Sequence, residues 1–267
     1  MKCKAVLVSM IATTMIFSGC SKEDSKEKLV VGMECNYAPF NWQISKPSGT
    51  SIDLDGAGFA DGYDIRIASY LGEELDREVD IKKIAWDGLI PAVNAGDIDV
   101  IIAGMTPRKG LDFTKPYYDS EMVMIVRKSD DEAKNAKSIQ DFSGKKVVGQ
   151  KNTNYDYIID QIEGVEHAVP KNNYPEMIVA LQKYDVDAIT AEYPVALGVV
   201  GANNDLAIVR FDSGQGFDMD TSVAVGMKEG SKDSELFQQI EAALDRLSNE
   251  VRQQWMEDAV STQPKVQ

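Results

Sequence analysis

The strongest constraint on the fold is a regular alternation of strand-like and helical segments in the first half of the chain. The strand-like runs are short and apolar, and the helical segments repeat apolar side chains every three or four residues. This order predicts parallel strands joined by covering helices, because parallel strands need a crossover connection. The expected elements, in the order strand, helix, strand, helix, strand, occupy residues 29–33, 63–75, 78–84, 86–95 and 99–105.

A second α/β unit follows a charged, turn-like junction at residues 128–141. One long amphipathic helix is expected over residues 234–258, and residues 43–61 are expected to form a loop rich in Ser, Gly, Asp and Pro. Further strands are expected at residues 121–127, 145–149, 187–190 and 221–227, and further helices at residues 155–162 and 175–184.

Two such units in series predict an α/β fold with two lobes, each built on a mostly parallel sheet flanked by helices. The last strand and helix can rejoin the first unit, so the chain would cross between the lobes twice and form a two-strand hinge. We expect lobe 1 to comprise residues 29–125 and 221–267, and lobe 2 residues 126–220. A cleft between two lobes is a common binding place for a small ligand.

The N-terminus has the pattern of a targeting signal and not of a fold. Two lysines precede a stretch of 13 uncharged, apolar residues, which is too short to span a membrane. The stretch ends in Ser-Gly followed by Cys20, which resembles a lipoprotein signal peptide over residues 1–19 with lipid attached to Cys20. Residues 20–28 would form a polar tether. The plainer alternative is a secretory signal with a chance cysteine.

Composition excludes several classes of function. The formal net charge is −15, and loss of residues 1–19 would take it to −17, which argues against a nucleic-acid partner. Only Cys35 would remain in the mature chain, so no internal disulfide can form, and a lone cysteine is usually a small buried side chain. We find no Ser-His-Asp set, no zinc-spaced Cys and His, and no phosphate loop, so no metal or cofactor is expected.

Six short motifs occur in a set order, and together they resemble one known family. They are residues 36–40 (NYAPF), 62–65 (GYDI), 86–92 (WDGLIPA), 96–99 (GDID), 101–106 (IIAGMT) and 112–118 (DFTKPYY). The series is similar to the polar amino-acid substrate-binding proteins of ABC transporters, which have the type II periplasmic-binding-protein fold. The resemblance covers residues 29–260. It implies a monomeric transport protein and not an enzyme, with a free amino acid and an ABC transporter permease as partners.

A zwitterionic ligand buried between two lobes needs a partner for each of its charges. The resemblance places the carboxylate clamp at Arg108, on a shortened loop where Lys109 is the alternative. It places Thr106 and backbone donors around Gly104 beside the same carboxylate, with Thr153 facing them from the second lobe. The plainer readings are a solvated arginine and threonines that bond their own loops.

The remaining candidates would hold the ammonium group and the ligand side chain. The resemblance makes Glu192 the ammonium partner, at a position where the family usually has Asp, and makes Tyr37 and Trp86 aromatic walls. Glu34 follows the first strand, and an acid there favours a cationic side chain. Surface acid and plain core are the alternatives for these residues. Asp64 is expected to be an N-terminal helix cap.

The predicted function is therefore an extracytoplasmic, lipid-anchored solute-binding protein that delivers a polar, cationic amino acid to an ABC importer. Two other classes stay open. Some relatives of this fold are dehydratases, and such chemistry would need a positioned acid or base in the cleft. A ligand-sensing input protein would normally carry a transmembrane helix and a signalling domain.

Overall fold

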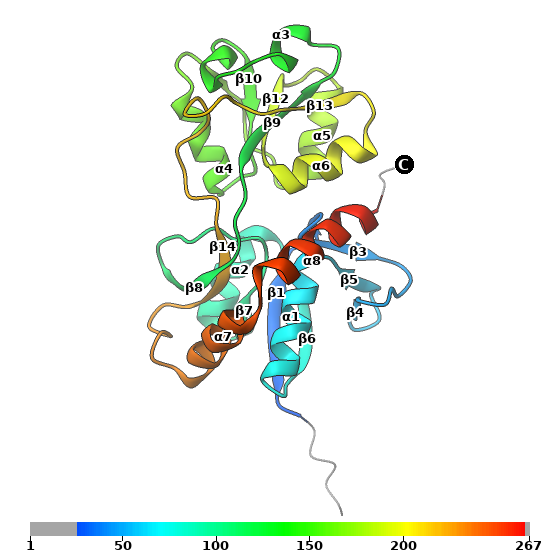
Figure 1. Ribbon diagram of the computed structural model, residues 1–267, viewed down its shortest axis with the longest axis vertical. Helices are drawn as coiled ribbons and strands as arrows, with labels where there is room; N and C mark the ends of the chain where they lie inside the picture. Colours follow the sequence, from blue (N-terminus) through cyan, green and yellow to red (C-terminus); the bar gives the residue numbers. More distant parts are fainter. Residues whose placement is uncertain (1–25, 265–267) are drawn as a thin grey trace, which may run out of the picture.

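Two lobes joined by two extended chain segments make up the molecule, as the computed structural model in Figure 1 shows for residues 26–264. The first lobe is built on a five-stranded sheet whose strands are, in spatial order, β6 (Glu78–Lys83), β1 (Lys28–Met33), β7 (Val100–Ile101), β14 (Val223–Lys228) and β8 (Leu111–Tyr118). The second is built on β11 (Glu166–His167), β10 (Lys146–Val148), β12 (Ala188–Glu192), β9 (Met122–Arg127) and β13 (Leu206–Val209). The predicted two-lobed α/β fold is confirmed.

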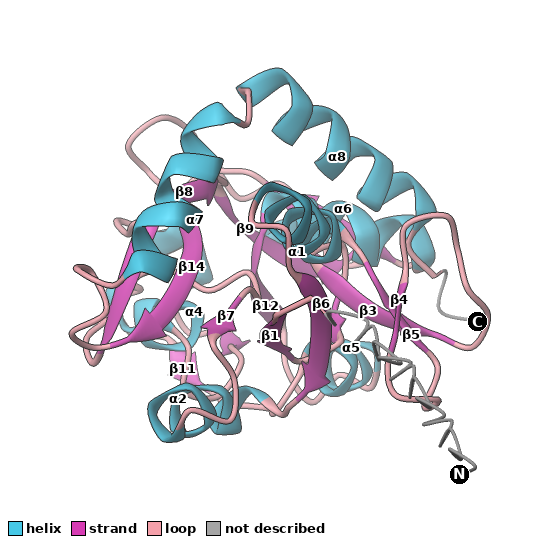
Figure 2. Ribbon diagram, turned by 90° about the horizontal axis from the view of Figure 1, so that it is seen from below, coloured by secondary structure: helices cyan, strands magenta, loops and turns pink. Residues whose placement is uncertain are grey.

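Helices flank both sheets. The first lobe carries α1 (Tyr63–Glu74), α2 (Trp86–Ala95), α7 (Glu235–Arg246) and α8 (Asn249–Thr262). The second carries α3 (Asp131–Lys134), α4 (Asn154–Tyr157), α5 (Tyr174–Gln182) and α6 (Tyr193–Ala202), with 3-10 turns η1 (Ile139–Phe142) and η2 (Ile158–Gln161). Figure 2 shows α1 and α7 on one side of the first sheet and α2 on the other. No helix within residues 26–264 has the length and apolar character needed to cross a bilayer.

Each sheet is mostly parallel, as predicted, with four strands running in one direction and one strand reversed. In the first sheet β1 pairs in parallel with β6 and β7, whereas β14 runs antiparallel to β7 and β8. In the second, β10 pairs in parallel with β11 and β12, whereas β9 runs antiparallel to β12 and β13. The antiparallel strands β9 and β14 are the ones through which the chain enters a new lobe, so each arrives from the opposite direction.

The chain passes between the lobes after β8 and again before β14. Thr221 on the second crossing donates a hydrogen bond to the carbonyl oxygen of Ser120 on the first, so the two segments are tied together at the hinge. The lobe boundary expected between residues 125 and 126 falls inside β9, all of whose pairing is in the second sheet. The division of the chain into lobes at particular residues stays a prediction.

Two local expectations were wrong. The single helix over residues 234–258 is two helices, because Leu247 is extended and the Ser248 side chain caps α8 by accepting a hydrogen bond from the Val251 amide at 3.3 Å. The expected loop at residues 43–61 contributes to a small sheet of β2 (Asn36–Tyr37), β3 (Asn41–Ile44), β5 (Phe59–Asp61) and β4 (Ile52–Asp53). The helix α6 was not anticipated.

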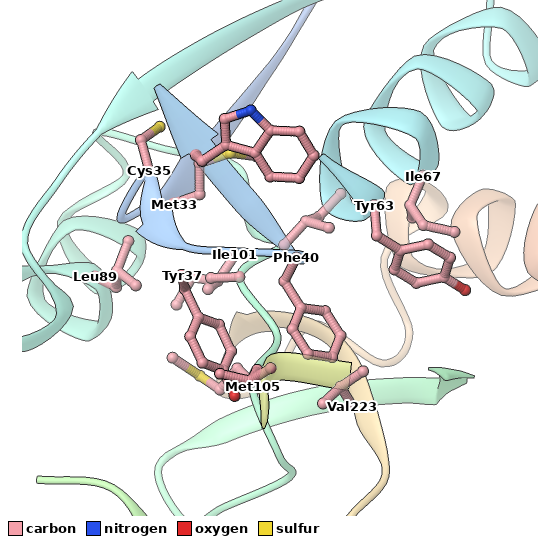
Figure 3. Packing of buried hydrophobic residues seen from close by; sticks show 14 of the residues in the cluster. Met33, Cys35, Tyr37, Phe40, Tyr63, Ile67, Leu89, Ile101, Met105 and Val223 are labelled. Carbon is pink, nitrogen blue, oxygen red and sulfur yellow. The ribbon is translucent and has the colours of Figure 1, made fainter. Parts of the chain in front are cut away.

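The first lobe's apolar core continues into the second lobe. Met33 and Leu89 of the first lobe and Met177 and Ile189 of the second belong to one connected cluster of buried side chains. Part of this cluster, around Tyr37, is shown in Figure 3. The lobes are therefore closed against each other, and the polar side chains that lie between them have little contact with solvent.

Candidate functional site

Hydrogen bonds join the two lobes across their facing surfaces. Nearly all involve residues that the sequence had singled out or their immediate neighbours. They run from Tyr37 to Glu192, Gln150 to Glu34 (3.1 Å), Trp86 to the Asn152 carbonyl (3.2 Å), Arg108 to the same carbonyl (2.9 Å), Asn152 to Asp87 (2.7 Å), and between Thr106 and Tyr155 (3.2 Å). The fold thus brings together side chains from positions far apart in the sequence.

Glu192 ends β12 and is fully buried between the lobes. Its Oε2 accepts a hydrogen bond from the Tyr37 hydroxyl, whereas its Oε1 is buried with no hydrogen-bond partner among the described residues. Burial raises the pKa of Glu192 to about 8, although the neighbouring Tyr37 hydroxyl acts in the opposite direction. An unsatisfied carboxylate oxygen in a buried site is costly, and a cation placed against it would relieve that cost.

Tyr37 is the aromatic centre of the interface. Its ring stacks on Phe40 with centroids 5.1 Å apart and lies against Tyr174 of the second lobe at 5.3 Å. Figure 3 shows the Tyr37 and Phe40 rings side by side above Met105. Burial, and secondarily the Glu192 carboxylate, raise the pKa of Tyr37 well above its usual value, so its hydroxyl is a hydrogen-bond donor at every physiological pH.

Gly104 lies directly beneath the Tyr37 ring. Its φ of 59° is in the left-handed region, and a Cβ at this position would lie 2.7 Å from Cε1 of Tyr37. Its amide donates to the Tyr117 hydroxyl at 3.0 Å and so is already paired within the first lobe. The residue therefore lets the ring approach the backbone, and its own amide is not a free donor for a ligand.

A pocket of about 350 Å³ opens between the lobes beside these contacts. Glu34 and Trp86, both singled out from the sequence, are on its wall. Burial raises the pKa of Glu34 to about 7, with the Gln150 hydrogen bond opposing the shift. The pocket is lined by Glu34, Asn36, Lys83, Ala85, Trp86, Asp87, Lys151, Asn172 and Asn173. Its lining carries both signs of charge, so it suits a polar ligand group.

The residues predicted to bind the ligand carboxylate lie where the two lobes meet. Arg108 uses its guanidinium to bond the Asn152 carbonyl, while Lys109 on the same loop is exposed. Thr106 shares a hydrogen bond with Tyr155. Thr153 donates to the Gln150 carbonyl at 2.7 Å and caps α4, as in the plainer reading of this residue. Their roles as ligand contacts stay predictions.

Two other sequence expectations, for Cys35 and Asp64, can be compared directly with the structure, as can the backbone at Asn152. Asn152 has a φ of 60°, a left-handed conformation that asparagine tolerates better than most residues. Cys35 is buried, as expected. Asp64 is not a helix cap: Gly62 occupies that position, and the Asp64 side chain is fully buried and accepts from Asn41 and Tyr117 instead. Cys20 lies outside the described residues.

Sequence reasoning missed much of the second lobe's contribution. Tyr155 and Tyr174 are buried against the interface and Asn172 lines the pocket, yet none stood out in the sequence. Gln150 had a usable signal, because it begins the loop that contains Thr153. Asp87 had one too, since it follows Trp86 at the start of an expected helix. Within residues 26–264 no group of three or more His, Cys, Asp or Glu side chains is placed to hold a metal ion.

Comparison with known proteins shows which proteins this chain is similar to. The profile of the bacterial extracellular solute-binding proteins, family 3, matches residues 29–258. The L-cystine-binding protein TcyJ of Escherichia coli is 28% identical over 218 residues, covering 80% of this chain and 75% of that protein. A probable histidine-binding protein of Campylobacter jejuni is 32% identical over 202 residues, covering 71% and 70%. The L-arginine-bound protein AbpA of Streptococcus pneumoniae is 30% identical, with a TM-score of 0.74 over 88% of this chain and 94% of that one.

Proposed function

The chain belongs to the bacterial extracellular solute-binding proteins of family 3, and on that premise we propose that it captures a cationic amino acid between its lobes for an ABC importer. Family 3 proteins and the relatives named above are binding proteins and not enzymes. Binding of a polar amino acid for import follows from the family. The cationic side chain, the residues that contact it and the lipid anchor are proposals.

The observation that carries the proposal is the buried, half-satisfied carboxylate of Glu192. An α-ammonium group supplies three donors and a positive charge, which is the chemistry that Oε1 lacks. Tyr37 already donates to Oε2 and has an apolar ring, so it can cover the ligand backbone while its hydroxyl helps to orient the carboxylate. Glu192 is proposed as the ammonium partner on this basis.

The proposed side-chain pocket is the one on whose wall Glu34 lies. Among residues 26–264 its Oε2 is hydrogen-bonded only to the Gln150 amide, so a guanidinium or ammonium could displace that contact and gain a charge-assisted one. Trp86 on the same wall offers an aromatic face to a cation. AbpA is bound to L-arginine, and the Campylobacter jejuni relative is a probable histidine-binding protein. Both support a ligand with a cationic or imidazole side chain.

The proposed carboxylate site is formed by Arg108, Thr106 and Thr153. The Arg108 guanidinium donates a hydrogen bond to the backbone carbonyl of Asn152. A carbonyl is a weaker partner for a guanidinium than a carboxylate is. A ligand carboxylate between the lobes could therefore take over Arg108, with the hydroxyl groups of the two threonines nearby. Lys109 is the alternative clamp on the same loop.

The proposed setting is the outer face of a membrane. Family 3 proteins are extracellular, which supports an extracytoplasmic location. The Ser-Gly-Cys20 motif after an apolar stretch supports attachment of a lipid to Cys20. A polar tether would follow it, and the mature chain would be acidic. Metabolic labelling with a palmitate analogue tests this, because a Cys20→Ser variant should lose both the label and membrane retention.

Isothermal titration of the mature protein against L-arginine, L-lysine, L-histidine, L-glutamine, L-glutamate and L-cystine tests the ligand class. We expect arginine or lysine to bind most tightly, since Glu34 offers a negative charge to the side chain. Tightest binding of glutamate would contradict the cationic proposal. Binding of none of these amino acids would contradict the function itself.

Replacement of Glu34 by glutamine is expected to weaken arginine binding by about tenfold to a hundredfold. A hydrogen bond to a charged group contributes about 1.5–3 kcal/mol, and the variant removes that charge while keeping the side chain's shape. Glutamine binding should change by less than about threefold. Glu74→Gln is the matched control, because Glu74 is an acid of the same lobe paired with Arg246 on the surface. Equal losses for both ligands would argue against Glu34 as a selectivity residue.

Replacement of Gly104 by alanine is expected to weaken binding about tenfold or more. The new Cβ would push the Tyr37 ring, and a left-handed alanine costs about 1–2 kcal/mol in stability. Gly230→Ala is the matched control: Gly230 follows β14 of the same lobe and has a φ of 88° but open space around its Cβ position. Both variants should melt at lower temperature, whereas only Gly104→Ala should lose affinity in titrations. Unchanged affinity of Gly104→Ala would show that the ring's position is unimportant.

A further inference from the structure

A continuous chain of buried hydrogen bonds connects the two ligand-facing loops of the first lobe. The Cys35 amide donates to Oδ1 of Asn41 at 2.7 Å, and the Asn41 amide group donates to Oδ2 of Asp64 at 2.7 Å. From the other side the Gly104 amide donates to the Tyr117 hydroxyl at 3.0 Å, and that hydroxyl donates to Oδ1 of Asp64 at 2.7 Å. We call these five residues the Asp64 network. Its two halves meet on one carboxylate.

Each end of the Asp64 network is a hydrogen bond from the backbone amide of a turn. Each of these turns leads to residues that we propose as ligand contacts. Cys35 has a φ of 57° and Gly104 a φ of 59°, so each end is a left-handed turn. The first turn sends Glu34 and Tyr37 into the cleft. The second passes under the Tyr37 ring and leads to Thr106. A left-handed, non-glycine residue such as Cys35 is held only when its surroundings impose the conformation.

We propose that Asp64 is a positioning residue for ligand binding, which sets the two ligand-facing turns at a defined distance from each other. The inference rests on the proposed function, since it assumes that these turns contact a ligand. Asp64 itself is fully buried and lies behind the cleft, in the first turn of α1. It acts through Asn41 on one turn and through Tyr117 on the other.

The direction of every hydrogen bond in the network is determined by its ends. A backbone amide can only donate, so Asn41 must present its oxygen to Cys35 and its NH₂ group to Asp64. For the same reason Tyr117 must accept from Gly104 and give its hydrogen to Asp64. Position 64 therefore has to accept on both of its oxygens. A carboxylate does so and an amide cannot.

Stability alone does not account for this arrangement. A buried carboxylate without a cationic partner is expensive, and apolar residues of similar shape are often as stabilising. The helix N-terminus and the two donors offset that cost, and burial raises the pKa of Asp64 only to about 6, so it accepts on both oxygens at neutral pH. What an apolar replacement would lose is the link between the two turns.

The test compares Asp64→Asn, Tyr117→Phe and a double variant that combines Asn41→Asp with Asp64→Asn. The double variant swaps the carboxylate and the amide, so it keeps both side-chain sizes and the buried charge. It also restores a donor for every acceptor, because a carboxylate at position 41 can accept both from the Cys35 amide and from a side-chain amide at position 64.

Arginine binding and amide exchange are the two readouts. L-arginine is the titrated ligand. Exchange of the Cys35 and Gly104 amide hydrogens is measured in the ligand-free protein and so needs no ligand. Tyr70→Phe is the control, since its hydroxyl bonds the Ala243 carbonyl in the same lobe, away from the cleft.

We expect Asp64→Asn to bind arginine about tenfold or more weakly and to exchange both amides faster. Tyr117→Phe should speed exchange at Gly104 and leave Cys35 protected. The double variant should recover affinity to within about threefold of the original protein, and Tyr70→Phe should lose stability without losing affinity. A loss of affinity in Asp64→Asn that Tyr70→Phe does not share at a comparable loss of stability is a result that general destabilisation could not produce.

Three outcomes would overturn the inference. They are unchanged amide exchange in Asp64→Asn, unchanged arginine affinity in a variant whose amides do exchange faster, and failure of the double variant to recover. If the original protein does not bind arginine, the cationic proposal fails, and the Asp64 network is then judged by amide exchange alone. The two proposals can thus fail separately.

Discussion

Replacing Glu192 by glutamine is expected to weaken binding of L-arginine by at least about 100-fold. The carboxylate is fully buried, and its Oε1 has no hydrogen-bond partner among the described residues, so the ligand's ammonium group would be its only strong partner. Removing one member of a buried ion pair typically costs about 3–5 kcal/mol, because the other charge is left uncompensated; about 3 kcal/mol corresponds to the expected loss. Isothermal titration at pH 8 measures it.

The same variant has a second signature that misfolding would not give. In the ligand-free protein glutamine removes a buried charge, so Glu192→Gln should melt at the same or a higher temperature than the original protein at pH 8. Glu166→Gln, in an exposed pair with Lys146 of the same lobe, is the matched control and should keep full affinity. Affinity of Glu192→Gln within about threefold of the original would refute the assignment of the ammonium site.

The elements that were predicted correctly are those whose signal is local. β1 is an apolar run, and α1 has apolar residues at helical spacing, so one face of each could be read from the sequence alone. α6 was missed because nearly all of its residues are apolar, which leaves no periodicity to detect. The break between α7 and α8 had a local signal in Ser248, but continuous apolar spacing on both sides concealed it.

The candidate site depended on a different kind of information. The family resemblance predicted Tyr37 and Glu192 for the cleft, and the position after the first strand predicted Glu34 for it. The structure does bring all three to the facing sides of the lobes. The pairing of Tyr37 with Glu192 joins residues 155 positions apart, which no local pattern encodes. The misreading of Asp64 has the same origin. An acid in the first turn of a helix is usually a cap, and only the packing of Asn41 and Tyr117 reveals another use.

Binding of arginine at pH 7 is expected to release between about one and about one and a half protons. In the ligand-free protein the pKa of Glu192 is raised to about 8 and that of Glu34 to about 7, so about nine-tenths of the former and about half of the latter are protonated at pH 7. A cation beside each carboxyl lowers its pKa, and the protons leave. Arginine affinity should therefore rise between pH 6 and pH 8, by up to about tenfold per pH unit for Glu192 alone.

Titrations in buffers of different ionisation enthalpy count these protons, and two comparisons assign them. Glutamine should release about half a proton fewer than arginine, because it has no charge to place at Glu34, and Glu192→Gln should lose most of the release. A proton count of zero at pH 7 would mean that these two carboxyls do not pair with the ligand's charges.

The same two carboxyls determine how the stability of the ligand-free protein depends on pH. Both have pKa values above the unfolded value of about 4.5, so the folded protein holds more protons than the unfolded chain between pH 5 and pH 8. Its stability should fall as the pH rises through that range, by at most about 1.4 kcal/mol per pH unit for each carboxyl, and saturating arginine should abolish this fall because both carboxyls are then ionised in the folded protein as they are in the unfolded chain. Thermal melts at several pH values measure this, and stability that rises with pH in the ligand-free protein would show that the two carboxyls are not held protonated between the lobes.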